Sequence, residues 1–473
     1  MPPAAGRMSR THRRHGDSAL EARTDGDVSA RSPPTVCADR EELLRRFQLV
    51  RQASLEMCRP LAAEVFRLQP AEEVSPPWWN LGHTSWFFVR NVLMPFGGAS
   101  DPEDAEFDHV LNSYYATFGE RLARSRRGSL SRPTTAEIYE YRASVDRRIE
   151  ALLKSIDEQQ LDELEFRLAV GINHEQQHQE LFYTEVKYIL AQNAPRLRTP
   201  YLQLPGTEAS LGEPGPLKFI EFAGGLLEFG HADSTWCWDN ELPRHKYYLA
   251  SFALADRLST NREFLDFMED GGYRRQLLWL DNGWRAAQEH GWQAPLYWER
   301  LDGQWWNWTL AGPRPLALDE PVCHVSFYEA DAFARWWSEN FASECTLRLP
   351  NEREWEHAAR SIEQASEQRM AEQSFLNRDR LHPSSAAGHE SLRQLFGVVW
   401  QWTSSYHEPY PGYRTFTGEL AEYNGKFMDN QRVLRGGSCM TPRDHFRVTY
   451  RNFWPAATRF QFSGIRLARD LEA

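Results

Sequence analysis

The spacing of hydrophobic residues divides the chain into a regular first part and an irregular second part. In residues 40–61 (REELLRRFQLVRQASLEMCRPL) apolar side chains recur every three to four positions, as an amphipathic helix requires. Residues 134–156 and 162–193 share this pattern, with Thr134 available as an N-cap behind Pro133 and only Gly171 interrupting the longer segment. Four helices joined by loops predict a helical bundle over residues 38–195.

The pattern changes after about residue 195. The segment PRLRTPYLQLPGTEASLGEPG is rich in Pro and Gly, which predicts a linker over residues 196–215. Beyond it, short strand-like runs (LKFIEFAG, LLEFG, KYYLASFALAD) alternate with Gly, Asn and Asp turns. Two short helices are expected, at 261–272 and 326–342. We therefore expect residues 216–473 to form a loop-rich α+β domain, which is a common setting for a substrate pocket.

Composition narrows the class of protein. A chain of 473 residues is too long for one small core, and its net charge of −12 argues against a broad nucleic-acid surface. No apolar stretch approaches the roughly 20 residues of a membrane span. Residues 1–37 lack the apolar core of a secretory signal and predict a disordered tail. The six cysteines form no CxxC pair and suit a reducing cytoplasm, so a cytoplasmic location is expected.

The segment INHEQQHQE carries the strongest local signal. His174 and His178 are four residues apart on an expected helix, so both imidazoles lie on one face where they can share a metal ion. Gln177 projects from nearly the same face and could orient a substrate or a metal-bound water. HEQQH also fits the H-E-x-x-H pattern of zinc peptidases, with Glu175 as the general base, although short matches of this kind arise by chance.

A third histidine strengthens the metal hypothesis. His83 lies in the aromatic segment PPWWNLGHTSWFF, near an expected helix start, where a buried imidazole requires a partner. A core histidine bonded to backbone would satisfy the same requirement. Three neutral imidazoles on facing helices suit iron, copper or zinc and leave coordination positions open. The sequence does not choose among these metals.

At this point the chain resembles a known family. The succession GHTSWFF, NSYY, RRGSLSRPT and NHEQQHQE is similar to the DinB-like helical domain of ergothioneine-pathway sulfoxide synthases. The second half resembles the formylglycine-generating-enzyme fold, a variant of the C-type lectin fold, through GGLLEFG, RLPNEREWEHAAR, GVVWQWTSS and RVLRGGS. The resemblance implies an α+β multidomain protein, with a DinB-like four-helix bundle followed by a C-type-lectin-like domain.

The resemblance also implies an activity. Enzymes of this family bind non-haem Fe(II) through three histidines, which match His83, His174 and His178. They join the imidazole C2 of hercynine to a cysteine-type sulfur with dioxygen and leave a sulfoxide. Iron would gather both substrates and activate dioxygen in one coordination shell. The expected partners are therefore these small molecules, with no nucleic acid and no membrane.

Further positions carry over from the family pattern. Gln177 matches a glutamine that contacts the hercynine imidazole, and Tyr423 matches a second substrate-contacting tyrosine. Asn452 and Phe453, in TYRNFW, match positions near the trimethylammonium group, where an aromatic face suits a quaternary cation. Core packing is the alternative role for Phe453.

Two more groups extend the expected site. Tyr114 and Tyr115, in NSYY, resemble a tyrosine pair near the iron and are the candidate proton donors. Arg127 and Arg132 flank RGSLSRP, where an arginine could pair with a substrate carboxylate. A solvated surface position is the alternative for each arginine.

Several positions depart from the mycobacterial branch of the family. Trp454 and Thr458 occupy the places of an aspartate and an arginine that hold γ-glutamylcysteine. The catalytic tyrosine of that branch has no match in this chain, since Leu420 stands three residues before Tyr423. The sulfur donor therefore remains open between γ-glutamylcysteine and cysteine. A selenosugar donor, as in selenoneine synthesis, and histidine as acceptor, as in ovothiol synthesis, are further alternatives. No cysteine follows Cys439, which argues against formylglycine generation.

Two other classes compete with a sulfoxide synthase. A zinc hydrolase or thiol transferase on the bundle would use Glu175 as its base, and it should lose activity in a Glu175→Gln variant. A lectin-like binding module on a structural bundle would bind no metal and consume no oxygen.

Overall fold

The computed structural model describes residues 39–98, 101–192, 198–201, 215–341, 346–363, 375–386 and 392–471. The expected tail, 1–37, and most of the expected linker, 196–215, lie outside the described residues. Among the described residues, no helix is long and apolar enough to cross a bilayer.

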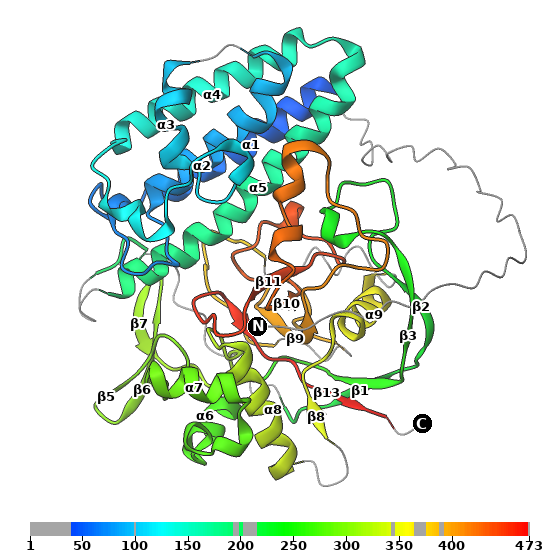
Figure 1. Cartoon of the computed structure of the whole chain (residues 1–473). Coiled ribbons are helices and arrows are strands. Elements are labelled where there is room, and N and C mark those ends of the chain that lie inside the picture. The colour runs from blue at the N-terminus through cyan, green and yellow to red at the C-terminus, as the bar shows by residue number, and fades with distance from the viewer. Residues whose placement is uncertain are drawn as a thin grey trace, which may run out of the picture. The chain divides into compact units, whose positions relative to one another are not determined.

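The described residues from 40 to 191 form helices, as the hydrophobic spacing predicts (Figure 1). They comprise α1 (Arg40–Cys58), α2 (Pro77–Phe88), α3 (Pro102–Leu111), α4 (Thr135–Ser155) and α5 (Glu158–Ala191). The short α3 is a fifth helix that the pattern did not predict. Helix α5 runs unbroken through Gly171 and begins four residues before the expected start. His83 is the seventh residue of α2, so it lies in mid-helix instead of near the start.

Local sequence fixes the start of α4 and allows the close approach of α2 and α5, the two helices that carry the histidines. Thr134 caps α4 as expected: its hydroxyl accepts from the Glu137 amide at 3.2 Å, and the Glu137 carboxylate accepts from the Thr134 amide at 2.6 Å. Gly171 allows α5 to approach α2, because a β-carbon there would lie 2.4 Å from the Phe88 ring. Any larger residue would push apart the helices of His83 and His174.

The second half contains short strands in four sheets among the described residues (Figure 1). One sheet has the order β1-β4-β13-β8 (Phe219–Phe222, Phe252–Ala255, Ala468–Asp470, Leu347–Arg348), and another has the order β11-β10-β9-β12 (Asn452–Pro455, Gln431–Arg435, Trp400–Tyr406, Ser463–Gly464). Smaller antiparallel sheets pair β2 with β3 (Gly225–Phe229, His245–Leu249) and β5 with β6 and β7 (Trp298–Leu301, Gln304–Thr309, Gly312–Pro315). The strand-like runs near residues 217–256 correspond to β1 to β4.

Helices of the second half cover parts of these sheets. The two expected segments form α6 (Asn261–Glu269) and α8 (Phe327–Phe341), whereas α7 (Asp281–Glu289) and α9 (Glu352–Glu363) were not predicted as helices. Helix α9 is short and mostly charged, and it buries only a few apolar residues, among them Trp355, Ala358 and Ala359. Such a short apolar stripe gives little periodic signal.

The helical part and the sheet part share one core. A single cluster of buried hydrophobic residues extends from Phe47 and Trp86 in the helices to Trp238, Phe333 and Trp402 in the second half. Residues 34–473 accordingly form one compact unit. Side chains from both parts can therefore meet around one site.

Candidate metal centre and substrate cavity

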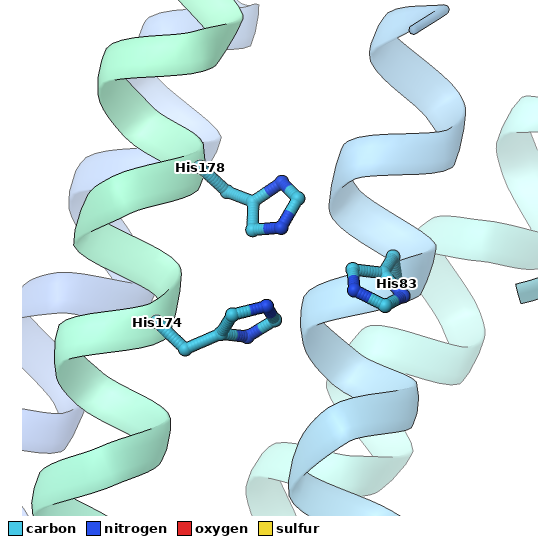
Figure 2. A group of neighbouring side chains, drawn as sticks. All are labelled: His83, His174 and His178. Atoms are coloured by element: carbon cyan, nitrogen blue, oxygen red, sulfur yellow. The ribbon is translucent and has the colours of Figure 1, made fainter. Parts of the chain in front are cut away.

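The three expected histidines converge in the structure. One ring nitrogen of each of His83, His174 and His178 lies within 4.8 Å of the others, and all three residues are buried. Figure 2 shows the imidazoles of His174 and His178 projecting from α5 towards that of His83 on α2. Helical spacing of four residues and the close approach of the two helices produce this group, which suits a metal ion.

Neighbouring polar groups orient two of the rings. The Nδ1 atom of His83 donates to the Leu111 carbonyl at 2.7 Å, at the end of α3. Nδ1 of His178 donates to the Asn80 Oδ1 atom at 2.8 Å, and the Asn80 amide nitrogen donates to Glu185 at 2.6 Å. Both rings therefore direct Nε2 to the shared space, as the hydrogen-bond partners of metal-binding histidines commonly achieve.

The protein alone leaves ring nitrogens without partners. Nε2 of His83 and Nδ1 of His174 are buried and form no hydrogen bond with the described residues. Burial and the neighbouring imidazoles lower the pKa of His83 and of His174 well below the usual range. Burial, with the charge of Arg127, lowers the pKa of His178 to about 3. Neutral imidazoles with free lone pairs are what a divalent metal requires.

A cavity of about 290 Å³ opens beside the histidines. His174 and His178 form part of its wall. The residues that line it come from both halves of the chain and include Tyr114, Tyr115, Arg124, Gln177, Glu180, Trp238, Trp400, Tyr423, Lys426, Tyr450, Asn452, Phe453, Trp454 and Thr458. Mostly apolar walls with a few polar groups are typical of a small-molecule site.

The two tyrosines of NSYY both line the cavity but differ in their surroundings. The Tyr114 ring meets the His83 ring edge-on, with centroids 5.7 Å apart. Burial alone would raise the pKa of Tyr114, but the positive charges of Arg127 and Arg124 lower it below its usual value. Burial and the neighbouring Tyr114 raise the pKa of Tyr115. Tyr114 is thus the more acidic hydroxyl of the pair.

The structure brings neither of the expected arginines to the cavity wall. Arg127 is fully buried, with its guanidinium 3.3 Å from the Trp79 ring centroid, and it donates to the Ser75 hydroxyl at 2.7 Å. Arg132 is on the surface, where it pairs with Glu106 and Glu137. The arginine from this stretch that lines the cavity is Arg124, which lies in the 3-10 turn Arg124–Ser129. The sequence offered three neighbouring arginines but no sign of the direction of each side chain.

The other expected substrate residues lie together. Gln177 accepts a hydrogen bond from the Tyr423 hydroxyl and donates one to the Tyr450 hydroxyl, each at 2.6 Å. Asn452 and Phe453 follow Tyr450 and line the same cavity. Tyr450 was missed as a site residue, although it stands in the TYRNFW segment that drew attention to its neighbours.

Aromatic rings form the side of the cavity around Phe453. Its ring stacks on His407, with centroids 3.9 Å apart, and the Phe427 ring lies tilted beside it, with centroids 5.8 Å apart. Trp454 and Thr458, the two positions that depart from the mycobacterial pattern, also line the cavity. At these two positions the wall therefore presents an indole and a hydroxyl, which carry no charge.

Glu175 has a different environment from that of a zinc-peptidase base. Its carboxylate pairs with Arg51 at 2.9 Å and with Arg142, and it accepts from the Ser54 hydroxyl at 2.6 Å. Burial alone would raise its pKa, but Arg142 and Arg51 lower it to about 2. A carboxylate paired with two arginines is a poor proton acceptor. This environment therefore argues against Glu175 as a general base.

The described cysteines lie apart from this chemistry. Cys58, Cys237, Cys323 and Cys439 are free and buried, and none lines the cavity. Cys439 is a small buried residue after RGGS. Cys37 and Cys345 lie outside the described residues.

Two protein families match the chain. The Sulfatase-modifying factor enzyme 1-like domain matches residues 214–471, which is more than half of the chain, and the DinB superfamily matches residues 46–182. These matches confirm the expected fold class of a DinB-like helical part followed by a formylglycine-generating-enzyme-like part.

Full-length relatives carry both parts. The hercynine oxygenase of Mycolicibacterium smegmatis is 30% identical over 457 residues, covering 91% of this chain and 99% of the relative. The hercynine oxygenase of Mycobacterium tuberculosis is 30% identical over 418 residues, covering 84% of this chain and 92% of the relative. The hercynine oxygenase of Mycolicibacterium thermoresistibile is 29% identical, with 92% of this chain covered and 96% of the relative.

Proposed function

The chain belongs to the hercynine oxygenase family, and on that premise we propose that it joins C2 of hercynine to the sulfur of a cysteine-type thiol in ergothioneine biosynthesis. The reaction removes one hydrogen from C2 and one from the thiol and forms the C–S bond. One atom of dioxygen goes to the sulfur as a sulfoxide, and the other leaves as water. The single observation that carries this proposal is the buried histidine triad beside a cavity built by both halves.

Iron fits the donor set. His83, His174 and His178 would hold Fe(II), since all three are neutral and ring nitrogens of His83 and His174 lack any partner among the described residues. A bound Fe(II) would supply the activation of dioxygen and the acidification of the thiol. No protein carboxylate belongs to the group, so coordination positions stay open towards the cavity.

Hercynine is oriented by groups on two sides. The Gln177 amide, held between Tyr423 and Tyr450, is placed to hydrogen-bond the imidazole of hercynine. The Phe453 ring, which lines the cavity, suits the trimethylammonium group, because that group has no hydrogen to donate and is attracted to a π face. Asn452 adds a polar contact beside it.

Tyr114 is the proton donor that the surroundings favour. It lies against His83, faces the cavity and has two arginines that lower its pKa, whereas burial raises the pKa of Tyr115, which also lines the cavity. A tyrosine at this position can deliver a proton to the oxygen atom that leaves as water. A Tyr114→Phe variant should lose most sulfoxide formation, while a Tyr115→Phe variant should retain it.

The sulfur donor is cysteine in this proposal. Trp454 and Thr458 offer no charge for the glutamyl group of γ-glutamylcysteine, and Arg124 supplies a positive charge for one carboxylate. A selenium donor or histidine as acceptor would use the same cavity and is distinguished by the product.

The test is reconstitution of the full chain with Fe(II) without oxygen, followed by oxygen uptake and product mass with hercynine and either cysteine or γ-glutamylcysteine. We expect uptake and a hercynine–cysteine sulfoxide, with cysteine favoured. Zinc-loaded protein and a His178→Ala variant should consume no oxygen. Bound iron without uptake for any hercynine and thiol pair would refute the proposal.

A further inference from the structure

A chain of five hydrogen-bonded side chains connects Tyr423 in the cavity with Asn173 on α5. Tyr423 donates to Gln177, Gln177 donates to Tyr450 at 2.6 Å, and the Tyr450 hydroxyl lies 3.0 Å from Nε2 of His445. Nδ1 of His445 lies 2.9 Å from the Asn173 Oδ1 atom. His445 is buried and does not line the cavity.

The direction of every bond in this chain follows from its far end. The Asn173 amide nitrogen donates to the Ala169 carbonyl at 2.9 Å within α5, so its Oδ1 atom must face His445. Nδ1 of His445 therefore carries the ring proton. Burial and Arg447 lower the pKa of His445 well below the usual range, so the ring is neutral and Nε2 is an acceptor.

The orientation of Gln177 is the consequence. The Tyr450 hydroxyl has one proton, and it is donated to Nε2 of His445, so the oxygen can only accept from Gln177. The amide nitrogen of Gln177 must then face Tyr450, and its carbonyl oxygen must face Tyr423. The Tyr423 ring lies 5.8 Å from that of His174, so the acceptor end of the amide is directed to the tyrosine that packs against the histidine triad.

We propose that His445 is a positioning residue which, through Tyr450, holds the acceptor oxygen of Gln177 towards the metal side to receive the imidazole N–H of hercynine. This inference rests on the proposed function for the identity of the ligand. It does not require contact between His445 and any substrate. A reversed amide would present an N–H donor to a substrate N–H and would weaken binding.

Two amide substitutions separate this role from simple packing. Glutamine reproduces the Nε2 position of histidine and can accept from Tyr450, whereas asparagine reproduces only the Nδ1 position beside Asn173. We expect H445Q to keep KM for hercynine within about threefold and H445N to raise it about tenfold, as loss of one hydrogen bond would. KM for the thiol and the iron content should stay unchanged in both variants.

Controls make the comparison specific. The same two substitutions at exposed His109 on α3 should leave every parameter as in the parent protein. In a Tyr450→Phe background the difference between H445Q and H445N should vanish, because the link to Gln177 is already broken. Equal effects of H445Q and H445N on hercynine, or equal effects on both substrates, would overturn the inference.

The tautomer provides a readout that needs no activity. In protein labelled with ¹⁵N-histidine, the His445 signals, assigned by their loss in H445Q, should show the proton on Nδ1. A proton on Nε2 would overturn the inference even if hercynine is oxidised. Absence of hercynine oxidation in the parent protein together with an Nδ1 proton would instead refute the proposed function and leave the hydrogen-bond chain intact.

Discussion

Asn80 accepts a hydrogen bond from His178 across 2.8 Å, while its own amide nitrogen donates to the buried carboxylate of Glu185. Glu185 also accepts from the Ser75 amide at 2.9 Å, so the carboxylate is fixed by two donors. This arrangement fixes the orientation of the Asn80 side-chain amide. The amide in turn fixes the tautomer of His178. One histidine of the triad, on α5, is therefore oriented by a residue on α2, three positions before His83.

An Asn80→Ala variant should bind metal about 10- to 100-fold more weakly, as expected when a histidine ligand loses the hydrogen bond that orients its ring. The ring of His178 would be free to rotate and to adopt either tautomer. Competition with a chelator, followed by metal analysis, measures the change. Asn91→Ala is the matched control, because Asn91 is also a buried asparagine, but its amide nitrogen donates to the Phe87 carbonyl. Equal affinities for the two variants would contradict the argument.

Glu175→Gln should reduce stability and leave the chemistry of the folded protein intact. The substitution removes the carboxylate that pairs with buried Arg51 and Arg142, and breaking such a pair costs about 3–5 kcal/mol. Urea unfolding measures this loss. Glu163→Gln is the control, since Glu163 is half-exposed where it pairs with Arg167, and such a solvent-accessible pair contributes about 0–1 kcal/mol.

Activity per bound metal decides between the two roles of Glu175. We expect that ratio to match the parent protein for the folded fraction of Glu175→Gln. Loss of turnover with unchanged stability would instead indicate a general base and revive the zinc-hydrolase alternative.

Phe453→Leu should weaken the binding of hercynine more than the binding of histidine. The aromatic face contributes about 0.5–2 kcal/mol to binding a quaternary ammonium, which corresponds to a rise in KM for hercynine of about 2- to 30-fold. Histidine, whose ammonium can hydrogen-bond elsewhere, should change less. Steady-state kinetics with both acceptors tests this, with Phe341→Leu at an exposed position as control. A parallel loss for both acceptors would indicate that Phe453 serves only packing.

Local pattern predicted the parts of this molecule that depend on neighbours in sequence. The periodicity of residues 40–61, 134–156 and 162–193 predicted three helices, and a spacing of four residues placed His174 and His178 together. His83 was recognised because an imidazole among aromatic residues requires a partner. These inferences need only the helical period and the cost of burying a polar group.

Contacts between distant segments could not be predicted in this way. Arg124 and Arg127 are three residues apart in one 3-10 turn, yet only Arg124 faces the cavity, because the turn and the Trp79 ring decide the direction of each side chain. The HEQQH pattern likewise does not indicate whether Glu175 faces a metal or two arginines. His445 acts on Gln177 across 268 residues of sequence, and nothing near either residue signals that link.

Lys187 is a buried cation on α5, the helix that also carries His174 and His178. Its ammonium donates to His324 Nε2 at 2.8 Å and lies 4.5 Å and 4.9 Å from the ring centroids of Tyr297 and Phe462. No carboxylate of the described residues forms an ion pair with it. Burial lowers its pKa from 10.5 to about 8, and the surrounding titratable and charged groups are Cys323, Cys439, Arg314 and Glu320.

Between pH 8 and 10.5 the unfolded chain therefore holds a proton on Lys187 that the folded chain has released. Because the unfolded state binds more protons there, this residue makes the free energy of unfolding rise with pH, by about 3 kcal/mol across the window. Lys187→Met removes this contribution, so the stability of the parent protein relative to the variant should increase as the pH rises from 8 to 10.5. Urea unfolding at a series of pH values measures the difference.

Lys154→Met, at an exposed position on α4, should follow the parent curve throughout. If the curves of the parent protein and Lys187→Met remained parallel, Lys187 would have an ordinary pKa in the folded protein, and its ammonium would have to be solvated in the native state.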